Sequence, residues 1–121
     1  MTLDALTEVA RGRLPLRAFR GVSDEAMAAM RVLGHQLAEA GRDQDARTIF
    51  EGLLALDARD VYARIALATL CLRAGDVLSA ESQLRLVLKE QPANRDARVR
   101  LSSALMGQGR AEEARAVSKG I

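Results

Sequence analysis

The stretch LAEAGRDQDA, residues 37–46, places a helix-breaking glycine five residues before a small alanine. The same pair recurs in AGDVLSA, residues 74–80, and in GQGRAEEA, residues 107–114. Glycine ends a helix in the left-handed conformation without a Cβ clash, and alanine lets two helices approach where a larger side chain would be strained. The recurrence therefore predicts three helical hairpins, each turned at its glycine and closed at its alanine.

An offset of 34 residues aligns the chain with itself. The aligned columns are Gly41, Gly75 and Gly109; Ala46, Ala80 and Ala114; Leu33, Leu67 and Leu101; Gly34, Ala68 and Ser102; and Leu37, Cys71 and Leu105. Five columns that agree at one period over three copies indicate a supersecondary unit that stacks on its neighbours. We therefore expect an all-α fold, with an N-terminal helix and connecting arm at residues 1–22 and three repeats at about 23–60, 61–94 and 95–121, the last one short.

Polar residues at the expected helix starts support this division. Ser23, Asp60 and Asn94 each suit a helix N-cap, because their side chains can accept a hydrogen bond from a backbone N–H of the first turn. Asp24 and Glu25 then place negative charge at the positive end of the first helix dipole. The apolar positions of the first hairpin fall at helical spacing. They are Met30, Leu33, Gly34 and Leu37 on one helix, and Ala46, Ile49, Phe50, Leu53 and Leu56 on the other.

Composition restricts the functions open to this chain. Apolar residues make up 49% of its 121 residues but aromatic residues only 2%, so the core is expected to consist of Leu, Ala, Val and Ile. The net charge is +2 with both signs interspersed, which argues against nucleic-acid binding, as does the lack of aromatic residues for base stacking. No segment approaches the roughly 18 apolar residues that a membrane span needs. Cys71 is expected to be a small buried side chain.

The sequence offers no pattern typical of catalysis. It has no Ser-His-acid spacing, no phosphate-binding loop and no paired carboxylates for a metal, so we expect a non-enzymatic protein without cofactor or metal. A lone histidine, His35, could titrate near neutrality. No second histidine accompanies it, so a metal site is not expected there.

The 34-residue spacing, with Gly, Ala and one Pro92 in register, resembles the tetratricopeptide repeat. The segment from Gly12 to about residue 60 further resembles the start of the class II chaperones of type III secretion, in which a short helix and a Gly-Val-Ser-acidic motif precede the first repeat. The matching residues are Gly12, Leu14, Gly21, Val22, Ser23, Asp24, Gly41, Ala46, Phe50, Leu56 and Asp57.

These resemblances imply a short right-handed superhelix of hairpins in the bacterial cytoplasm. By resemblance, the chain would hold a segment of a hydrophobic secreted translocator in its concave groove, mask it until export, and form a homodimer. The alternative is a generic tetratricopeptide adaptor or scaffold subunit of a larger complex. The resemblance implies no membrane and no nucleic-acid partner.

In such a stack the first helix of each hairpin lines the inner surface. The stripe beside the buried one is more apolar than an exposed face needs, which favours a groove for an extended peptide. The alternative is that these side chains pack against the adjacent inner helix. The candidate groove residues are Arg31, His35, Tyr62, Ile65, Thr69, Leu72, Arg73, Val99, Ser103 and Met106.

The N-terminal arm alternates apolar residues with arginines around Pro15, which interrupts any continuous helix. Three interpretations stay open. The arm contacts another subunit or a client, or it caps the first hairpin while its arginines stay in water, or it is a basic patch for a membrane or nucleic acid. The candidate dimer contacts are Leu3, Leu6, Val9, Leu14, Leu16 and Phe19.

Overall fold

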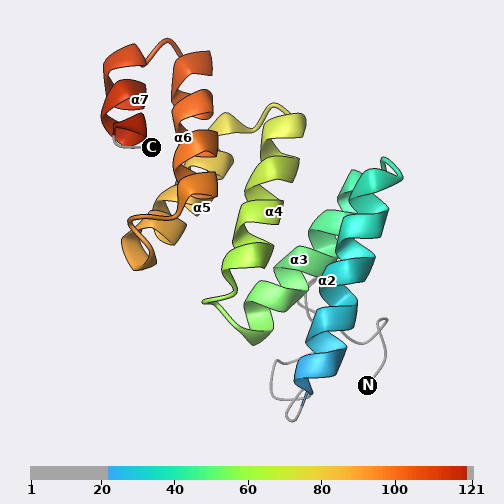
Figure 1. Ribbon diagram of the computed structural model, residues 1–121. Coiled ribbons are helices and arrows are strands. Elements are labelled where there is room, and N and C mark those ends of the chain that lie inside the picture. Colours follow the sequence, from blue (N-terminus) through green and yellow to red (C-terminus); the bar gives the residue numbers. More distant parts are fainter. Residues whose placement is uncertain (1–21, 120–121) are drawn as a thin grey trace. The chain divides into compact units, whose positions relative to one another are not determined.

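The computed structural model of the protein describes residues 22–119, which contain six helices and no strand (Figure 1). The helices are α2 (Asp24–Glu39), α3 (Asp43–Leu56), α4 (Val61–Arg73), α5 (Val77–Glu90), α6 (Arg95–Gly107) and α7 (Ala111–Ser118). Neighbouring helices pack on one another, α2 on α3, α5 on α6 and α6 on α7. The predicted all-α fold of helical hairpins is therefore confirmed.

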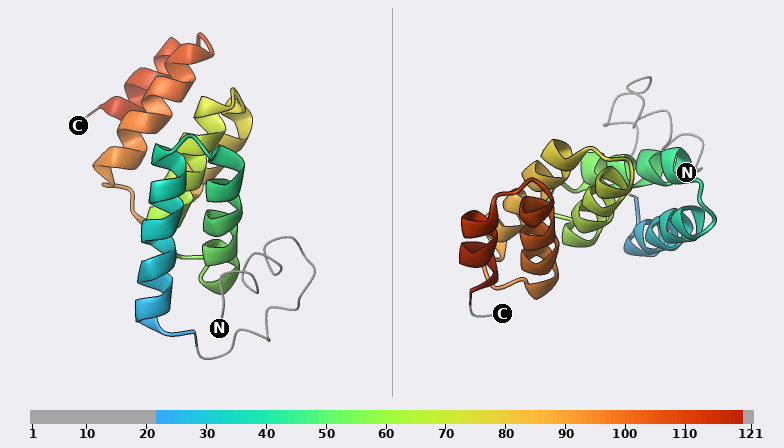
Figure 2. Two further views of the ribbon diagram at one scale, coloured as in Figure 1. Left: turned by 90° about the vertical axis from the view of Figure 1, so that its right-hand side faces the viewer. Right: turned by 90° about the horizontal axis from the view of Figure 1, so that it is seen from above.

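The chain divides into two compact units, Met1–Ala63 and Arg64–Ile121, which are described separately. The first contains the α2–α3 hairpin and the start of α4. The second contains the rest of α4 and the helices α5 to α7. Figure 2 shows the two helices of the first hairpin, in blue to green, side by side. The candidate dimer contacts of the N-terminal arm lie outside the described residues.

Each predicted glycine turn is present. Gly41, Gly75 and Gly109 have φ of 78°, 80° and 74°, the left-handed conformation that costs other residues about 1 kcal/mol or more. In every turn the N–H after the glycine donates to the carbonyl five residues earlier, at 2.8, 2.8 and 2.9 Å. Those carbonyls belong to the Leu37, Cys71 and Leu105 column. The turn that the opening stretch predicts is thus the same hydrogen-bonded unit three times over.

The predicted N-caps are also confirmed. Ser23, Asp60 and Asn94 each accept a hydrogen bond from the backbone N–H three residues later, at 3.1, 3.0 and 2.9 Å. Because these bonds fix where α2, α4 and α6 begin, the first helix of every hairpin starts at the same place in its repeat.

The α2–α3 hairpin closes around a pair of complementary side chains. Ala46 is fully buried, and Phe50 is 1% exposed. A Cβ on Gly34 would lie 2.7 Å from Cζ of the Phe50 ring, so only glycine leaves the ring its space. The next repeat carries Ala68 and Leu84 at the corresponding positions, a larger helix residue with a smaller partner. The two columns therefore vary together in size.

Two arginines take the place of an apolar residue in the later hairpins. Met30 is buried in the first hairpin, and the corresponding residues are Arg64 and Arg98. Arg64 Nη1 donates to Gln83 Oε1 at 2.7 Å, and Arg98 Nε donates to the Val117 carbonyl at 2.9 Å. Both acceptors lie 19 residues further on, so each guanidinium fastens its helix to the second helix of the same hairpin.

The last helix is short and weakly anchored by apolar residues. α7 has eight residues, of which Ala114 is buried. The Arg98 guanidinium also donates to the Lys119 carbonyl, so it satisfies carbonyls at the C-terminal end of α7 that no further turn can reach. The prediction of a short final helix from Ala111 is confirmed.

The cores of both units consist of aliphatic side chains, as the composition predicts. Cys71 is a free buried thiol, as expected. In the part of the chain that the structure describes, no helix is both long and apolar enough to cross a membrane. The largest fully buried residues are Phe50, Leu53, Leu84, Leu101, Leu105, Val87 and Cys71.

The contact of Gly34 with Phe50 makes a direct prediction. Gly34→Ala should lower the free energy of unfolding by about 1–3 kcal/mol, because the buried ring must shift to admit the methyl group. Urea denaturation followed by circular dichroism measures this change. Gly107→Ala is the matched control, since nothing lies within 4 Å of its Cβ and alanine is the better helix former. Equal effects of the two substitutions would contradict this account of the helix contact.

Candidate functional site

The second unit brings six of the candidate groove residues to corresponding places on two helices. Ile65, Thr69 and Leu72 lie on one stripe of α4, at i, i+4 and i+7. Their counterparts 34 residues later on α6 complete what we call the α4–α6 face. Its members are Ile65, Thr69, Leu72, Val99, Ser103 and Met106.

The α6 half of this face is open to solvent. Val99 is 48% and Met106 is 56% exposed, whereas Leu101 and Leu105 on the opposite side of the same helix are fully buried. Their exposure is therefore not a by-product of a small core. On α4 the members of the face are half-buried. Apolar side chains exposed at a repeated register mark a surface on which a partner can be bound.

One predicted residue belongs to the contact between helices. Thr69 Oγ1 donates to the Ile65 carbonyl at 2.9 Å and accepts a hydrogen bond of 2.9 Å from Arg100 Nη1. Arg100 Nε in turn donates to Asp96 Oδ1 at 2.7 Å. This chain of polar contacts holds α6 beside α4, so Thr69 positions the face. The interpretation that the stripe packs on the adjacent inner helix is correct for Thr69.

Arg100 was missed by the sequence reasoning. The only local signal was the acid four residues before it, Asp96, which is a common intrahelical ion pair. Nothing in the sequence indicated that the same guanidinium reaches the preceding first helix, 31 residues back. Arg73, the last residue of α4, is exposed beside the predicted stripe.

Three candidates lie in the first unit and take on other contacts there. Arg31 donates from Nε, at 3.0 Å, to Oδ2 of the buried Asp60, and this ion pair joins α2 to the turn before α4. The ring centroid of Tyr62 lies 6.1 Å from that of Phe50, and the residue is 47% exposed. His35 Nε2 lies 3.3 Å from a carboxylate oxygen of Glu39, and both side chains are exposed.

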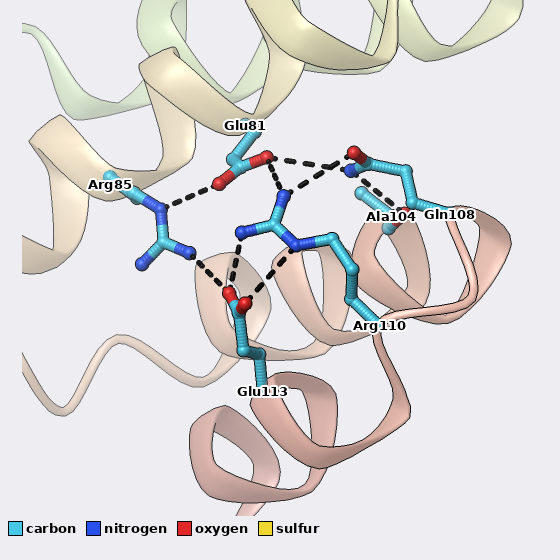
Figure 3. Close-up of polar contacts among 6 residues, drawn as sticks. All are labelled: Glu81, Arg85, Ala104, Gln108, Arg110 and Glu113. Atoms are coloured by element: carbon cyan, nitrogen blue, oxygen red, sulfur yellow. Dashed lines mark hydrogen bonds and ion pairs between the residues drawn. The ribbon is translucent and has the colours of Figure 1, made fainter.

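A cluster of charged groups fixes the hairpin that carries the α6 half of the face (Figure 3). Arg110 Nη1 donates to Glu81 Oε1 at 2.7 Å, and Arg85 Nε donates to Glu81 Oε2 at 2.9 Å. Arg110 also pairs with Glu113 of α7, which lies 3.6 Å from Arg85 Nη2. The Gln108 amide adds a bond of 3.4 Å to Glu81. One carboxylate of α5 thus anchors the turn between α6 and α7.

This cluster changes the acidity of Glu81. Hydrogen bonds from Arg110 and then from Arg85 lower the pKa of Glu81 from 4.5 to about 2, against the opposing effect of burial. The Glu81 side chain is only 13% exposed, so solvent screens the charges little. The folded state therefore strongly favours the carboxylate.

The arrangement is suited to binding rather than to bond making. Among residues 22–119, no group of three or more His, Cys, Asp or Glu side chains lies close enough to hold a metal ion. The exposed apolar positions of the α4–α6 face are held at fixed spacing by hydrogen bonds below them. Such a rigid apolar surface is a protein-interaction surface.

Comparison with known proteins agrees with this class. The family model described as tetratricopeptide repeat matches residues 72–120, from the last turn of α4 through α7. The match supports a tetratricopeptide repeat protein, and such repeats are protein–protein interaction modules that are generally non-catalytic. A comparison with curated proteins found no match.

The pKa of Glu81 predicts a dependence of stability on pH. Because the pKa is lowered in the folded state, the stabilisation is present above about pH 4.5 and is lost as the pH falls towards 2. Glu81→Gln should lower the free energy of unfolding by about 1–2 kcal/mol at pH 7, since charge-assisted hydrogen bonds are lost. The difference from the parent protein should vanish near pH 2, as measured by urea denaturation at each pH. A difference that persists at pH 2 would show that packing, not charge, is involved.

Proposed function

We propose that the protein is a non-catalytic chaperone that holds an extended segment of a client protein on the α4–α6 face. The observation that carries the proposal is the exposure of Val99 and Met106 in register with Ile65 and Leu72. Two apolar residues seven positions apart on one helix lie about 10 Å apart, which an extended chain spans in about three residues. The face therefore suits a short segment with apolar side chains at matching intervals.

The client class follows from the resemblance of the segment from Gly12 to residue 60 to the class II chaperones of type III secretion. Such a client is a translocator that inserts into membranes after export, so its apolar segments aggregate in the cytoplasm unless they are covered. Covering them requires apolar area and shape, which a repeat surface supplies without any reaction. A tetratricopeptide module is consistent with this task.

The proposal includes a homodimer, which the same resemblance implies. The apolar residues nearest to the N-terminus, Leu3, Leu6 and Val9, would form its contacts as one side of a short amphipathic helix. These residues lie outside the described part of the chain, so this contact stays a prediction.

Substitution of the exposed residues tests client binding. Val99→Asp with Met106→Asp places two charges on the face and should weaken binding to a translocator segment at least about tenfold, because buried apolar anchors dominate such interfaces. Isothermal titration calorimetry with the purified segment measures the affinity. Helicity should be unchanged because both side chains are about half exposed.

The matched control is Leu78→Asp with Leu86→Asp, which charges two exposed leucines of α5 outside the α4–α6 face. The control should bind the segment as the parent protein does. If both double variants bind equally well, the face is not the client site. If the protein instead co-purifies from its native cell in a stoichiometric assembly without any translocator, it is a tetratricopeptide adaptor.

A further inference from the structure

One side of α2 has no partner among the described residues that pack on this helix. Starting from Glu25, the positions that share this side follow at helical spacing, and every one of them is exposed. Val32, at its centre, is 56% exposed, whereas Met30 and Gly34 on the other side of the helix are buried. We call this side the α2 outer face. Its residues are Glu25, Ala28, Ala29, Val32, His35, Gln36 and Glu39.

The register of the repeats shows what this face lacks. Arg100 occupies the position of Val32 two repeats later, and it donates a hydrogen bond to Thr69 on the preceding first helix. This position therefore faces whatever precedes its own hairpin. Before α2 stands no hairpin in this sequence, only residues 1–22. An apolar Val32 at such a position calls for cover from that segment.

We propose that residues 13–20 lie as an extended segment antiparallel to α2 and cover the α2 outer face. The chain enters α2 at Ser23, so a segment that runs back along the helix needs only the turn at Gly21 and Val22. The lengths agree. Glu25 and Glu39 are 14 residues apart on the helix, about 21 Å, and Arg20 and Arg13 are seven residues apart, about 23 Å when extended.

The charges agree in the same register. The antiparallel direction places Arg20 beside Glu25 at the start of α2 and Arg13 near Glu39 at its end. Both acids are exposed, and the segment carries no acid of its own. An arginine beside each glutamate would neutralise both ends of the face, and the long arginine side chains can reach along it while their heads stay in water.

The apolar residues of the segment suit the centre of the face. Leu14, Leu16 and Ala18 alternate, so they share one side of an extended chain and can meet Val32 with its neighbouring alanines. Pro15 favours the extended conformation and has no N–H to leave unsatisfied against a helix.

The size of the face favours a tethered occupant. One valine and two alanines fall well short of the roughly 800 Å² per partner that a stable complex of separate proteins buries. A segment joined to the helix by two residues has an effective concentration in the millimolar range or above, so a small apolar contact is enough. The occupant is therefore residues 13–20 of the same chain, and this assignment is independent of client binding at the α4–α6 face.

Hydrogen–deuterium exchange of the full-length protein tests the proposal. Amides of residues 13–20 should exchange more slowly than in a synthetic peptide of the same sequence. Val32→Asp should speed their exchange about tenfold or more, because it removes the apolar contact at the centre of the face. Leu78→Asp, which charges a still more exposed leucine on α5, should leave their exchange unchanged.

A charge exchange tests the register. Glu25→Arg should speed exchange in residues 13–20, and the addition of Arg20→Glu should restore the slow rate. Asp24→Arg is the matched control, because it removes the same charge from the first turn of α2 but points about 100° away from Glu25. Exchange in the parent protein as fast as in the peptide would overturn the proposal. So would a change from dimer to monomer on Val32→Asp in light scattering, which would assign the face to a second copy of the chain.

Discussion

The hydrogen bond that closes each hairpin is the constraint on which the rest of this structure depends. At Gly41, Gly75 and Gly109 the chain takes a left-handed turn, and the next N–H reaches the carbonyl five residues back. The same bond in each repeat sets the same phase between the two helices of every hairpin. Because the phase repeats, side chains 34 residues apart occupy equivalent surroundings, and a stripe on α4 has its counterpart on α6.

The repeat is regular in its backbone and irregular in its side chains. Gly34 leaves room for the Phe50 ring, and the next hairpin has a larger helix residue with a smaller partner. Where the first hairpin buries Met30, the later ones extend a guanidinium to the second helix. Each substitution keeps the distance between two helices while it changes what fills the space. A 34-residue period therefore survives in a chain whose copies share few identical residues.

The sequence predicted the parts of the molecule that depend on local rules. The glycine turns, the caps at Ser23, Asp60 and Asn94 and the buried stripes all follow from propensity and periodicity. Contacts between charged residues far apart in the sequence were out of reach. Arg31 was expected on a binding surface, yet it holds Asp60, 29 residues away. A helical wheel shows the side from which a long side chain leaves, but its flexible stem decides which of several acceptors it meets. For the same reason the α4–α6 face was recognised, but the Arg100 bond beneath it was not.

The shared carboxylate of Glu81 has a consequence for how this molecule opens. Its two oxygens hold an arginine of its own helix and the arginine that starts α7. Unzipping of the C-terminal end therefore cannot proceed one helix at a time, because detaching α7 at its start also strips a counterion from the helix two steps back. We infer that the terminal hairpin dissociates as a block, so mechanical pulling on this end would meet a single rupture event rather than gradual fraying.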